Sequence, residues 1–119
     1  MVIDLKTALS HLPLPATPAW PEGVWDKTLF EHGTMSVIVF TPRGHDYQTK
    51  HSQDELYIVI SGSGDFIKNE QRCRFQAHDV LFVEAGIPHR FEKFTDDFAT
   101  WVVFWGPDGG EQVPNHVAS

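Results

Sequence analysis

The stretch of sequence that decides the fold is residues 49–62, which read TKHSQDELYIVISG. Apolar and β-branched residues dominate its second half, and side chains two positions apart in a strand point to the same face of a sheet. As one continuous strand, the stretch would place these residues on one face: His51, Gln53, Glu55, Tyr57 and Val59. The opposite face would carry Leu56, Ile58 and Ile60. A face that mixes an imidazole, an amide, a carboxylate and a phenol with apolar neighbours is typical of a cavity lining.

The pair formed by His51 and Glu55 indicates a metal ion. Burying a carboxylate and an imidazole without partners costs several kcal/mol, and a bound cation removes that cost. Carboxylate oxygen and imidazole nitrogen are both good ligands for Fe, Mn, Ni, Cu or Zn. The alternative is that both side chains lie at a solvated strand start, and the pair alone does not decide between the two readings.

The rest of the chain predicts one all-β domain. Short β-branched or aromatic runs alternate with turn signals at intervals of roughly eight to twelve residues, which is typical of a sandwich or barrel. No helical pattern between them is long enough for a parallel crossover. We expect a short helix, capped by Asp4 and ended by Pro13, with an extended arm over 1–23, a barrel over 24–106 and a tail over 107–119. The expected strands are 25–30, 35–41, 55–61, 65–68, 72–75, 80–83, 89–91 and 100–105.

A second stretch, residues 78–89, reads HDVLFVEAGIPH. Together the two stretches resemble the two sequence motifs of the cupins. In the first motif two His one residue apart precede a Glu and a Gly, and His51, Glu55 and Gly62 stand at the matching places. In the second a Gly begins a strand, a turn with Pro and Gly follows, and a His comes next, here Gly86 and His89. The resemblance implies a double-stranded β-helix, or jelly-roll, barrel.

The resemblance also implies that His89 joins His51 and Glu55 as a metal ligand. Three positions depart from the family pattern. Thr49 stands where the family has its first motif His, His78 replaces the Gly that starts the second motif, and Glu84 replaces the turn Pro. Because of Thr49, we expect three protein ligands instead of four, with Gln53, Gln48, Thr49 or His45 as candidates to complete the site.

The expected function follows from this ligand set. Two His and one carboxylate with open positions suit non-haem Fe(II) oxygen chemistry and are compatible with Zn. We therefore expect one divalent transition metal and, as the leading hypothesis, a dioxygenase that acts on a small organic, aromatic or weakly polar substrate inside the barrel. Tyr57 or Gln53 would orient a substrate oxygen. Two alternatives stay open: a non-catalytic module that binds a small ligand or stores metal, and a cupin isomerase.

The composition of the chain limits the classes of partner that we expect it to bind. The formal net charge of −7 argues against nucleic acid, which needs clustered Lys and Arg. Cys73 is the lone cysteine, and no long apolar run or leader pattern is present, so we expect a cytoplasmic protein that does not enter a membrane. The last strand is apolar on both faces, with Trp101, Val103 and Trp105 on one of them. Such a strand is covered on its outer face by the N-terminal arm or by a second subunit, and we expect a homodimer.

Overall fold

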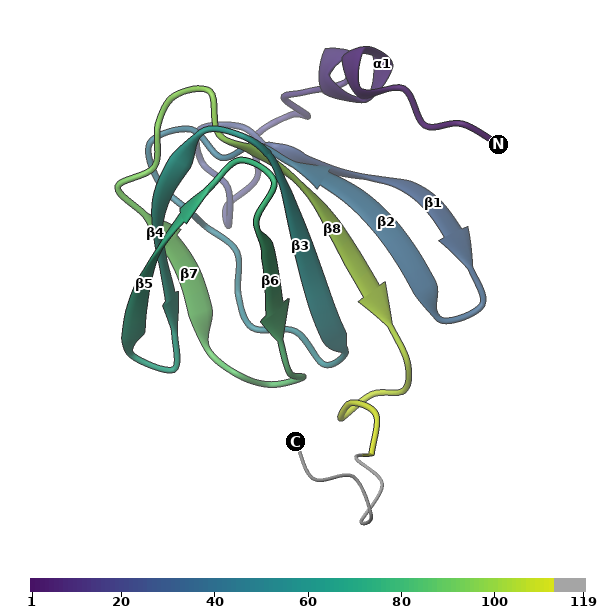
Figure 1. The fold of residues 1–119 in the computed structure, drawn as a ribbon. Helices are drawn as coiled ribbons and strands as arrows, with labels where there is room; N and C mark the ends of the chain where they lie inside the picture. The colour runs from purple at the N-terminus through teal and green to yellow at the C-terminus, as the bar shows by residue number, and fades with distance from the viewer. Residues whose placement is uncertain (113–119) are drawn as a thin grey trace.

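Two antiparallel β-sheets enclose the core of the protein (Figure 1). The structure is a computed structural model and describes residues 1–112. The larger sheet has the strand order β1-β2-β8-β3-β6 and the smaller one β5-β4-β7. The elements are α1 (Leu5–Ser10), β1 (Asp26–His32), β2 (Met35–Phe40), β3 (Asp54–Ser61), β4 (Ser63–Lys68), β5 (Gln71–Gln76), β6 (Val80–Val83), β7 (His89–Glu92) and β8 (Ala99–Trp105). The predicted all-β fold with a short N-terminal helix is confirmed.

The helix α1 begins where its cap was predicted. The side chain of Asp4 accepts a hydrogen bond of 3.0 Å from the backbone N–H of Thr7, which satisfies one free donor of the first turn. Beyond the helix, Leu14 exchanges two backbone hydrogen bonds with Val24, and the chain between them turns at residues 17–22. No helix among the described residues is long and apolar enough to cross a membrane. Within the predicted tail, residues 113–119 lie outside the described part.

Strand β3 alternates between core and surface as predicted over the part that begins at Glu55. Glu55, Tyr57 and Val59 are 1%, 0% and 1% exposed and point between the sheets. The opposite face, with Leu56, Ile58 and Ile60, is half-buried or exposed. The strand begins at Asp54, so this alternation does not extend to Gln53, which lies in the bend before the strand, or to His51, which precedes the bend.

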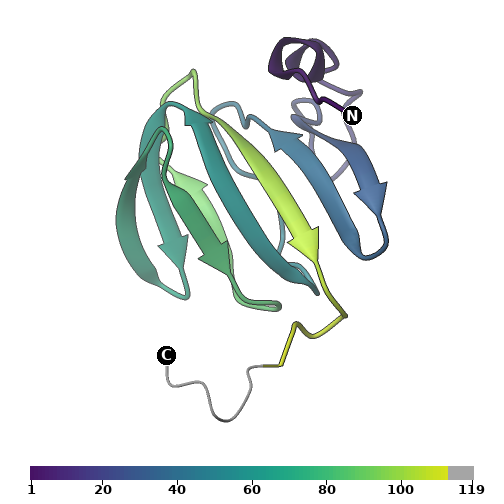
Figure 2. The ribbon, with the colours of Figure 1, turned by 45° about the vertical axis from the view of Figure 1, so that its right-hand side comes forward.

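The two sheets face each other (Figure 2), and aromatic side chains form much of the core between them. Phe66 from β4, Phe75 from β5 and Phe91 from β7 meet Tyr57 and Phe40 of the larger sheet. Their rings pack edge-on or tilted, with centroids 4.9 Å apart for Tyr57 and Phe91 and 5.3 Å for Phe75 and Phe91. Such contacts add to the free energy gained from apolar burial. They fix the separation of the sheets and so the width of the space between them.

Gly62, which ends the first motif, is required by its surroundings. Its φ of +82° lies in the left-handed region, and a Cβ added there would lie 2.6 Å from Cα of Phe98. Any other residue would be strained and would also push against backbone. The close approach lets β4 follow β3 after one residue, so the chain passes directly from the larger sheet to the smaller one.

The backbone conformation of His78 explains why the family pattern has a glycine at this position. Its φ is +74°, a conformation that costs an L-residue roughly 1–2 kcal/mol. We expect His78→Gly to stabilise the fold by about 0.5–1 kcal/mol, because relief of this strain exceeds the greater chain entropy that glycine adds to the unfolded state. Urea unfolding measures the change. Ala77→Gly, next to it and without positive φ, is the control and should destabilise the protein, so a loss of stability in both variants would contradict the explanation.

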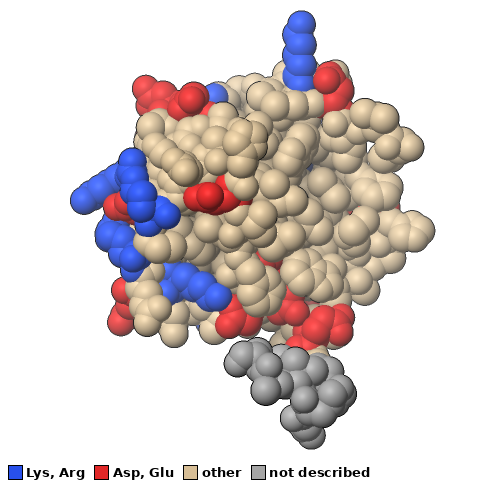
Figure 3. All heavy atoms as spheres, in the orientation of Figure 1, with Lys and Arg blue, Asp and Glu red and all other residues tan. Residues whose placement is uncertain are grey.

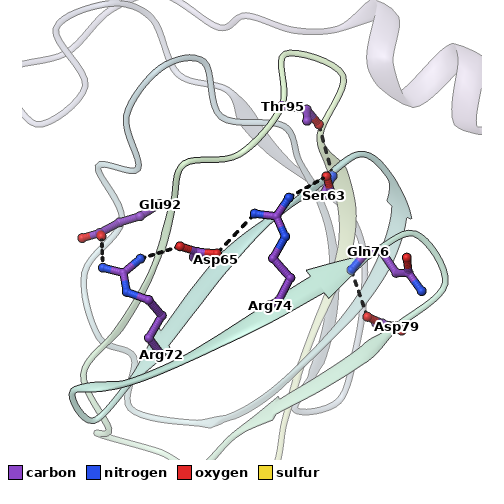
Figure 4. Close-up of polar contacts among 8 residues, drawn as sticks. All are labelled: Ser63, Asp65, Arg72, Arg74, Gln76, Asp79, Glu92 and Thr95. Carbon is purple, nitrogen blue, oxygen red and sulfur yellow. Dashed lines mark hydrogen bonds and ion pairs between the residues drawn. The ribbon is translucent and has the colours of Figure 1, made fainter.

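The outward face of the smaller sheet carries a lattice of ion pairs (Figure 4). Arg72 bridges Asp65 of β4, at 2.7 Å, and Glu92 of β7, at 2.6 Å. Arg74 lies 3.3 Å from the other Asp65 oxygen. Beneath the lattice Ile67 is only 3% exposed, because it stands opposite Arg72 and Arg90, whose aliphatic stems flank it. The outward face of the smaller sheet is therefore charged, and its charges are paired with one another. The outward face of the larger sheet differs in this respect.

Candidate metal centre

Three side chains from separate parts of the barrel meet at one point. His51 lies just before the bend that precedes β3, Glu55 on β3 and His89 at the start of β7. One ligand atom from each lies within 4.8 Å of the other two. The turn before β7 helps to place His51, since the backbone N–H of Gly86 donates a 2.7 Å hydrogen bond to the His51 carbonyl. The first motif is thus tied to the second at the site itself.

Glu55 is a buried carboxylate without a hydrogen-bond donor. It is 1% exposed, and neither Oε1 nor Oε2 has a hydrogen-bond partner among the described residues. Its neighbours across the sheet are apolar, Phe104 on β8 and Val83 on β6. A carboxylate in such surroundings is costly unless a cation accompanies it.

His89 faces Glu55 with its free nitrogen. Nδ1 lies 2.8 Å from the Ile87 carbonyl oxygen, and because a carbonyl only accepts, Nδ1 carries the proton. In the neutral ring Nε2 is then a bare lone pair, 2.9 Å from Oε1 of Glu55. Two lone pairs at that distance repel unless a proton or a metal ion lies between them. A second ring nitrogen bonded to a carbonyl is also how metal-binding histidines are oriented, so the residues fit a metal ion.

The pKa values of the two histidines shift in opposite directions. Burial lowers the pKa of His51 and outweighs the attraction of Glu55, which favours the neutral, metal-binding form. Burial also opposes the charged form of His89, but the contact with Glu55 and the bond to Ile87 prevail and raise its pKa. In the absence of metal, a proton on His89 takes over part of the cation's role.

A polar chain behind the ligands holds the Tyr57 hydroxyl in place. Asp46 accepts hydrogen bonds of 2.9 Å from the Phe91 N–H and from the Gln48 side-chain amide. That contact turns Oε1 of Gln48 toward Tyr57, whose hydroxyl donates to it over 3.1 Å. The same hydroxyl lies 3.0 Å from Nε2 of His89. Burial, followed by the charge of Glu55, raises the pKa of Tyr57 well above its usual value, so the phenol keeps its proton.

Gln48 was predicted from the sequence as a candidate to complete the metal site, but Asp46 was not. Asp46 is 8% exposed, and its carboxylate also accepts from the backbone N–H of Gln48. An Asp two residues before its backbone partner is a local turn signal, and that signal was available in the sequence. Its contact with Phe91, 45 residues away, was not.

The other candidates for a fourth ligand lie elsewhere. The Gln53 side-chain amide donates to the carbonyl oxygens of Thr34, at 3.0 Å, and Gly106, at 2.9 Å, so it fastens the end of β8. The structure therefore places Gln53 away from the three ligands, because the bend before Asp54 breaks the alternation that would have turned it inward. His45 and Thr49 are exposed.

A small cavity opens beside the ligands. It measures about 50 Å³, and its lining combines four polar with four apolar residues: Asp26, Gln48, His51, Glu55, Ile38, Phe40, Val102 and Phe104. A larger hollow of about 300 Å³ lies against α1 but contains none of the three ligands. The cavity next to His51 and Glu55 is therefore the one relevant to chemistry here.

Asp26 is the second acid of this cavity, and it predicts a dependence of stability on pH. Burial, with the Asp46 charge, raises the pKa of Asp26 above its ordinary 3.8. The folded state therefore disfavours the ionised form, and stability is lost as the pH rises through the folded-state pKa. We expect Asp26→Asn to be more stable than the wild type in urea at pH 7, with the difference vanishing below pH 3.8. The exposed control Asp96→Asn should show no such gain, and an equal gain in both would contradict the assignment.

Comparisons with known proteins agree with the barrel fold. The family model described as the cupin domain matches residues 36–105. An uncharacterized protein of Streptomyces coelicolor is 33% identical over 63 residues, which cover 53% of this chain and 60% of that protein's length. Among solved structures, a cupin 2 conserved barrel domain protein from Salinispora arenicola is similar at 20% identity and TM-score 0.59, over 68% of this chain and 74% of that one. A DMSP lyase from Ruegeria pomeroyi is similar at 24% identity and TM-score 0.57, over 68% of this chain and 46% of that one.

Proposed function

Since the chain belongs to the cupin domain family, we propose that it binds one divalent transition metal through His51, Glu55 and His89 and offers that metal to a small molecule. The observation that carries the proposal is the convergence of ligand atoms of His51, Glu55 and His89 within 4.8 Å of one another, around a carboxylate of Glu55 that is 1% exposed and whose contact among the described residues is Nε2 of His89, at 2.9 Å. A surface pair would be hydrated, and a purely structural carboxylate would be hydrogen-bonded. A cation among three converging donors accounts for both facts.

The leading activity is that of a dioxygenase. A metal held by two His and one carboxylate keeps positions open for a substrate oxygen and for O₂. Beside the metal ligands the chain supplies an oriented phenol. Asp46 accepts a hydrogen bond from the side-chain amide of Gln48 and so fixes its orientation, and Oε1 of Gln48 accepts the hydrogen bond that the Tyr57 hydroxyl donates. The Tyr57 oxygen therefore points a lone pair toward the ligands, where it can accept a hydrogen bond from a bound molecule.

The volume of the cavity limits the size of the substrate. A cavity of about 150 Å³ is needed to hold benzene in a protein core, whereas this one measures about 50 Å³. An aromatic substrate is therefore disfavoured, and a molecule of a few non-hydrogen atoms fits better. Four apolar side chains line the cavity beside the ligands, and they limit access of water to the bound molecule.

Measurements of oxygen uptake and of substrate turnover distinguish the alternative functions. Protein loaded with Fe(II) under nitrogen is mixed with air and a panel of small hydroxy, keto and amino acids, and oxygen uptake is followed with an electrode. An oxygenase consumes O₂ with one of them, and Tyr57→Phe lowers the rate while metal content stays constant. Metal binding without uptake would contradict the oxygenase and favour the non-catalytic module. A change of substrate without uptake would favour an isomerase.

We also infer that the chain forms a homodimer through the outer face of the larger sheet. A full row of apolar side chains crosses all five strands there: Phe30, Val37, Val103, Leu56 and Phe82. Phe82 is 45% exposed, and the adjacent row exposes Val80 at 59% and Ile58 at 38%. Figure 3 shows this face largely free of charge, while Lys and Arg gather over the smaller sheet. For a chain of net charge −7, a second copy can approach most closely where charge is absent.

Phe82→Glu is therefore expected to convert the dimer to a monomer, because it places a charge in the buried face, on the edge strand β6. Light scattering after size exclusion at micromolar concentration gives the mass. Asn69→Asp, which makes the same charge change at the exposed β4–β5 turn, is the control and should remain dimeric. A monomeric wild type would refute the inference.

A further inference from the structure

Asp26 is an acid placed where the fold would otherwise put an apolar side chain. It begins β1 opposite Phe40, and the same row continues through Thr100 to Val59. All three of these neighbours are buried, at 2%, 0% and 1% exposure. Asp26 shares their face of the sheet, so it points inward and lines the cavity beside His51 and Glu55.

Nothing among the described residues neutralises this carboxylate. Its side chain makes no hydrogen bond or ion pair there, in contrast to Asp46, which accepts from Phe91 and Gln48. The charge that acts on the Asp26 carboxylate is that of Asp46, which is also negative. Asp26 is half-buried, no donor or cation among the described residues compensates its charge, and such uncompensated groups gather at sites that bind ligands.

Two parts of the cavity lining therefore present opposite demands. At the metal ligands, a divalent ion balanced by the single carboxylate of Glu55 would keep one positive charge, which favours an anionic ligand oxygen. Asp26 accepts and does not donate, so it favours an N–H group that carries positive charge. The cavity has a volume of about 50 Å³, and a water needs roughly 10–15 Å³ on the same measure, so the cavity holds a ligand of about three to five non-hydrogen atoms.

We propose that Asp26 is the specificity-determining residue of this cavity and that the ligand class is a small zwitterion of the size of glycine. Its carboxylate would bind at the metal and its ammonium group would donate to Asp26. This inference rests on the metal-binding function proposed above. It adds that Asp26 recognises a positive group on the bound molecule.

A matched pair of probes tests the proposal. Glycine and glycolate have the same shape and the same carboxylate, and they differ in having an ammonium or a hydroxyl group. Both are titrated calorimetrically into Zn²⁺-loaded wild type, Asp26→Asn and the exposed control Asp96→Asn, and zinc is quantified in each sample before and after. We expect wild type and Asp96→Asn to prefer glycine by about 10-fold or more, the usual effect of one charge-assisted hydrogen bond. Asp26→Asn should lose that preference and keep its zinc.

Two results would overturn the proposal. Equal affinities for the two probes in zinc-loaded wild type, or a glycine preference that survives in Asp26→Asn, would remove Asp26 from ligand recognition and leave the metal site intact. Absence of zinc from the wild type would instead refute the metal-binding function, and the inference with it. Should Asp26→Asn fail to fold by circular dichroism, Asp26→Ser removes the same charge with a smaller side chain and gives the same comparison.

Discussion

Glu55→Gln is expected to abolish tight metal binding. The substitution keeps the shape of the side chain and removes the charge that balances the cation between His51 and His89. Loss of an outer-shell partner alone costs about 10–100-fold in metal affinity, so loss of a charged ligand should cost more than about 100-fold. The readout is the melting temperature with and without added Zn²⁺.

The size of the effect follows from linkage. At a free metal concentration of roughly 100 times Kd, binding stabilises the folded state by about 2.7 kcal/mol, which raises the melting temperature of a domain this size by about 10 °C. The wild type should show that rise and Glu55→Gln should not. Gln53→Ala, whose side chain is bonded to Thr34 and Gly106, should lower the starting melting temperature and keep the rise. An unchanged rise in Glu55→Gln would exclude Glu55 as a ligand.

Gly62→Ala is expected to destabilise the fold by about 3 kcal/mol. Strain in the left-handed region contributes roughly 1–2 kcal/mol, and the overpacking of a fixed backbone adds about 1–3 kcal/mol. The clash is with Cα and N of Phe98, at 2.6 and 2.9 Å, so no side-chain rotation relieves it. Urea unfolding with an unchanged m-value measures the loss.

Gly33→Ala is the matched control. Gly33 also has a positive φ, +58°, but a Cβ there would meet nothing within 4 Å. Only the conformational strain should remain, and the loss should be about 1–2 kcal/mol. Equal losses in the two variants would show that the approach of Phe98 to Gly62 does not limit substitution.

The sequence predicted the fold well because the relevant signals are local. Alternation from Glu55 to Val59 identified the inner face of β3, and the turn residues placed the neighbouring strands. The site was predicted in part. His51, Glu55 and His89 do meet, yet His51 reaches the others from the segment before a bend, which simple alternation does not describe. The same bend turns Gln53 away from the cavity, which alternation along a strand does not predict.

Asp26 and Asp46 could not be identified from sequence spacing. Asp26 enters the cavity only because β1 pairs with β2, and β2 with β8, in the observed register. Asp46 becomes important because a loop brings it to the backbone of Phe91. Both placements depend on pairings between distant segments, which periodicity within one segment does not contain.

The central claim is that the three residues hold a metal ion, and elemental analysis tests it most directly. Wild-type protein is purified without chelator and analysed by mass spectrometry for Fe, Mn, Ni, Cu and Zn, beside His51→Ala and His89→Ala. The account predicts close to one metal ion per chain in the wild type and little in either variant. A folded wild type without stoichiometric metal, which also takes up none when Fe(II) or Zn²⁺ is added, would contradict it.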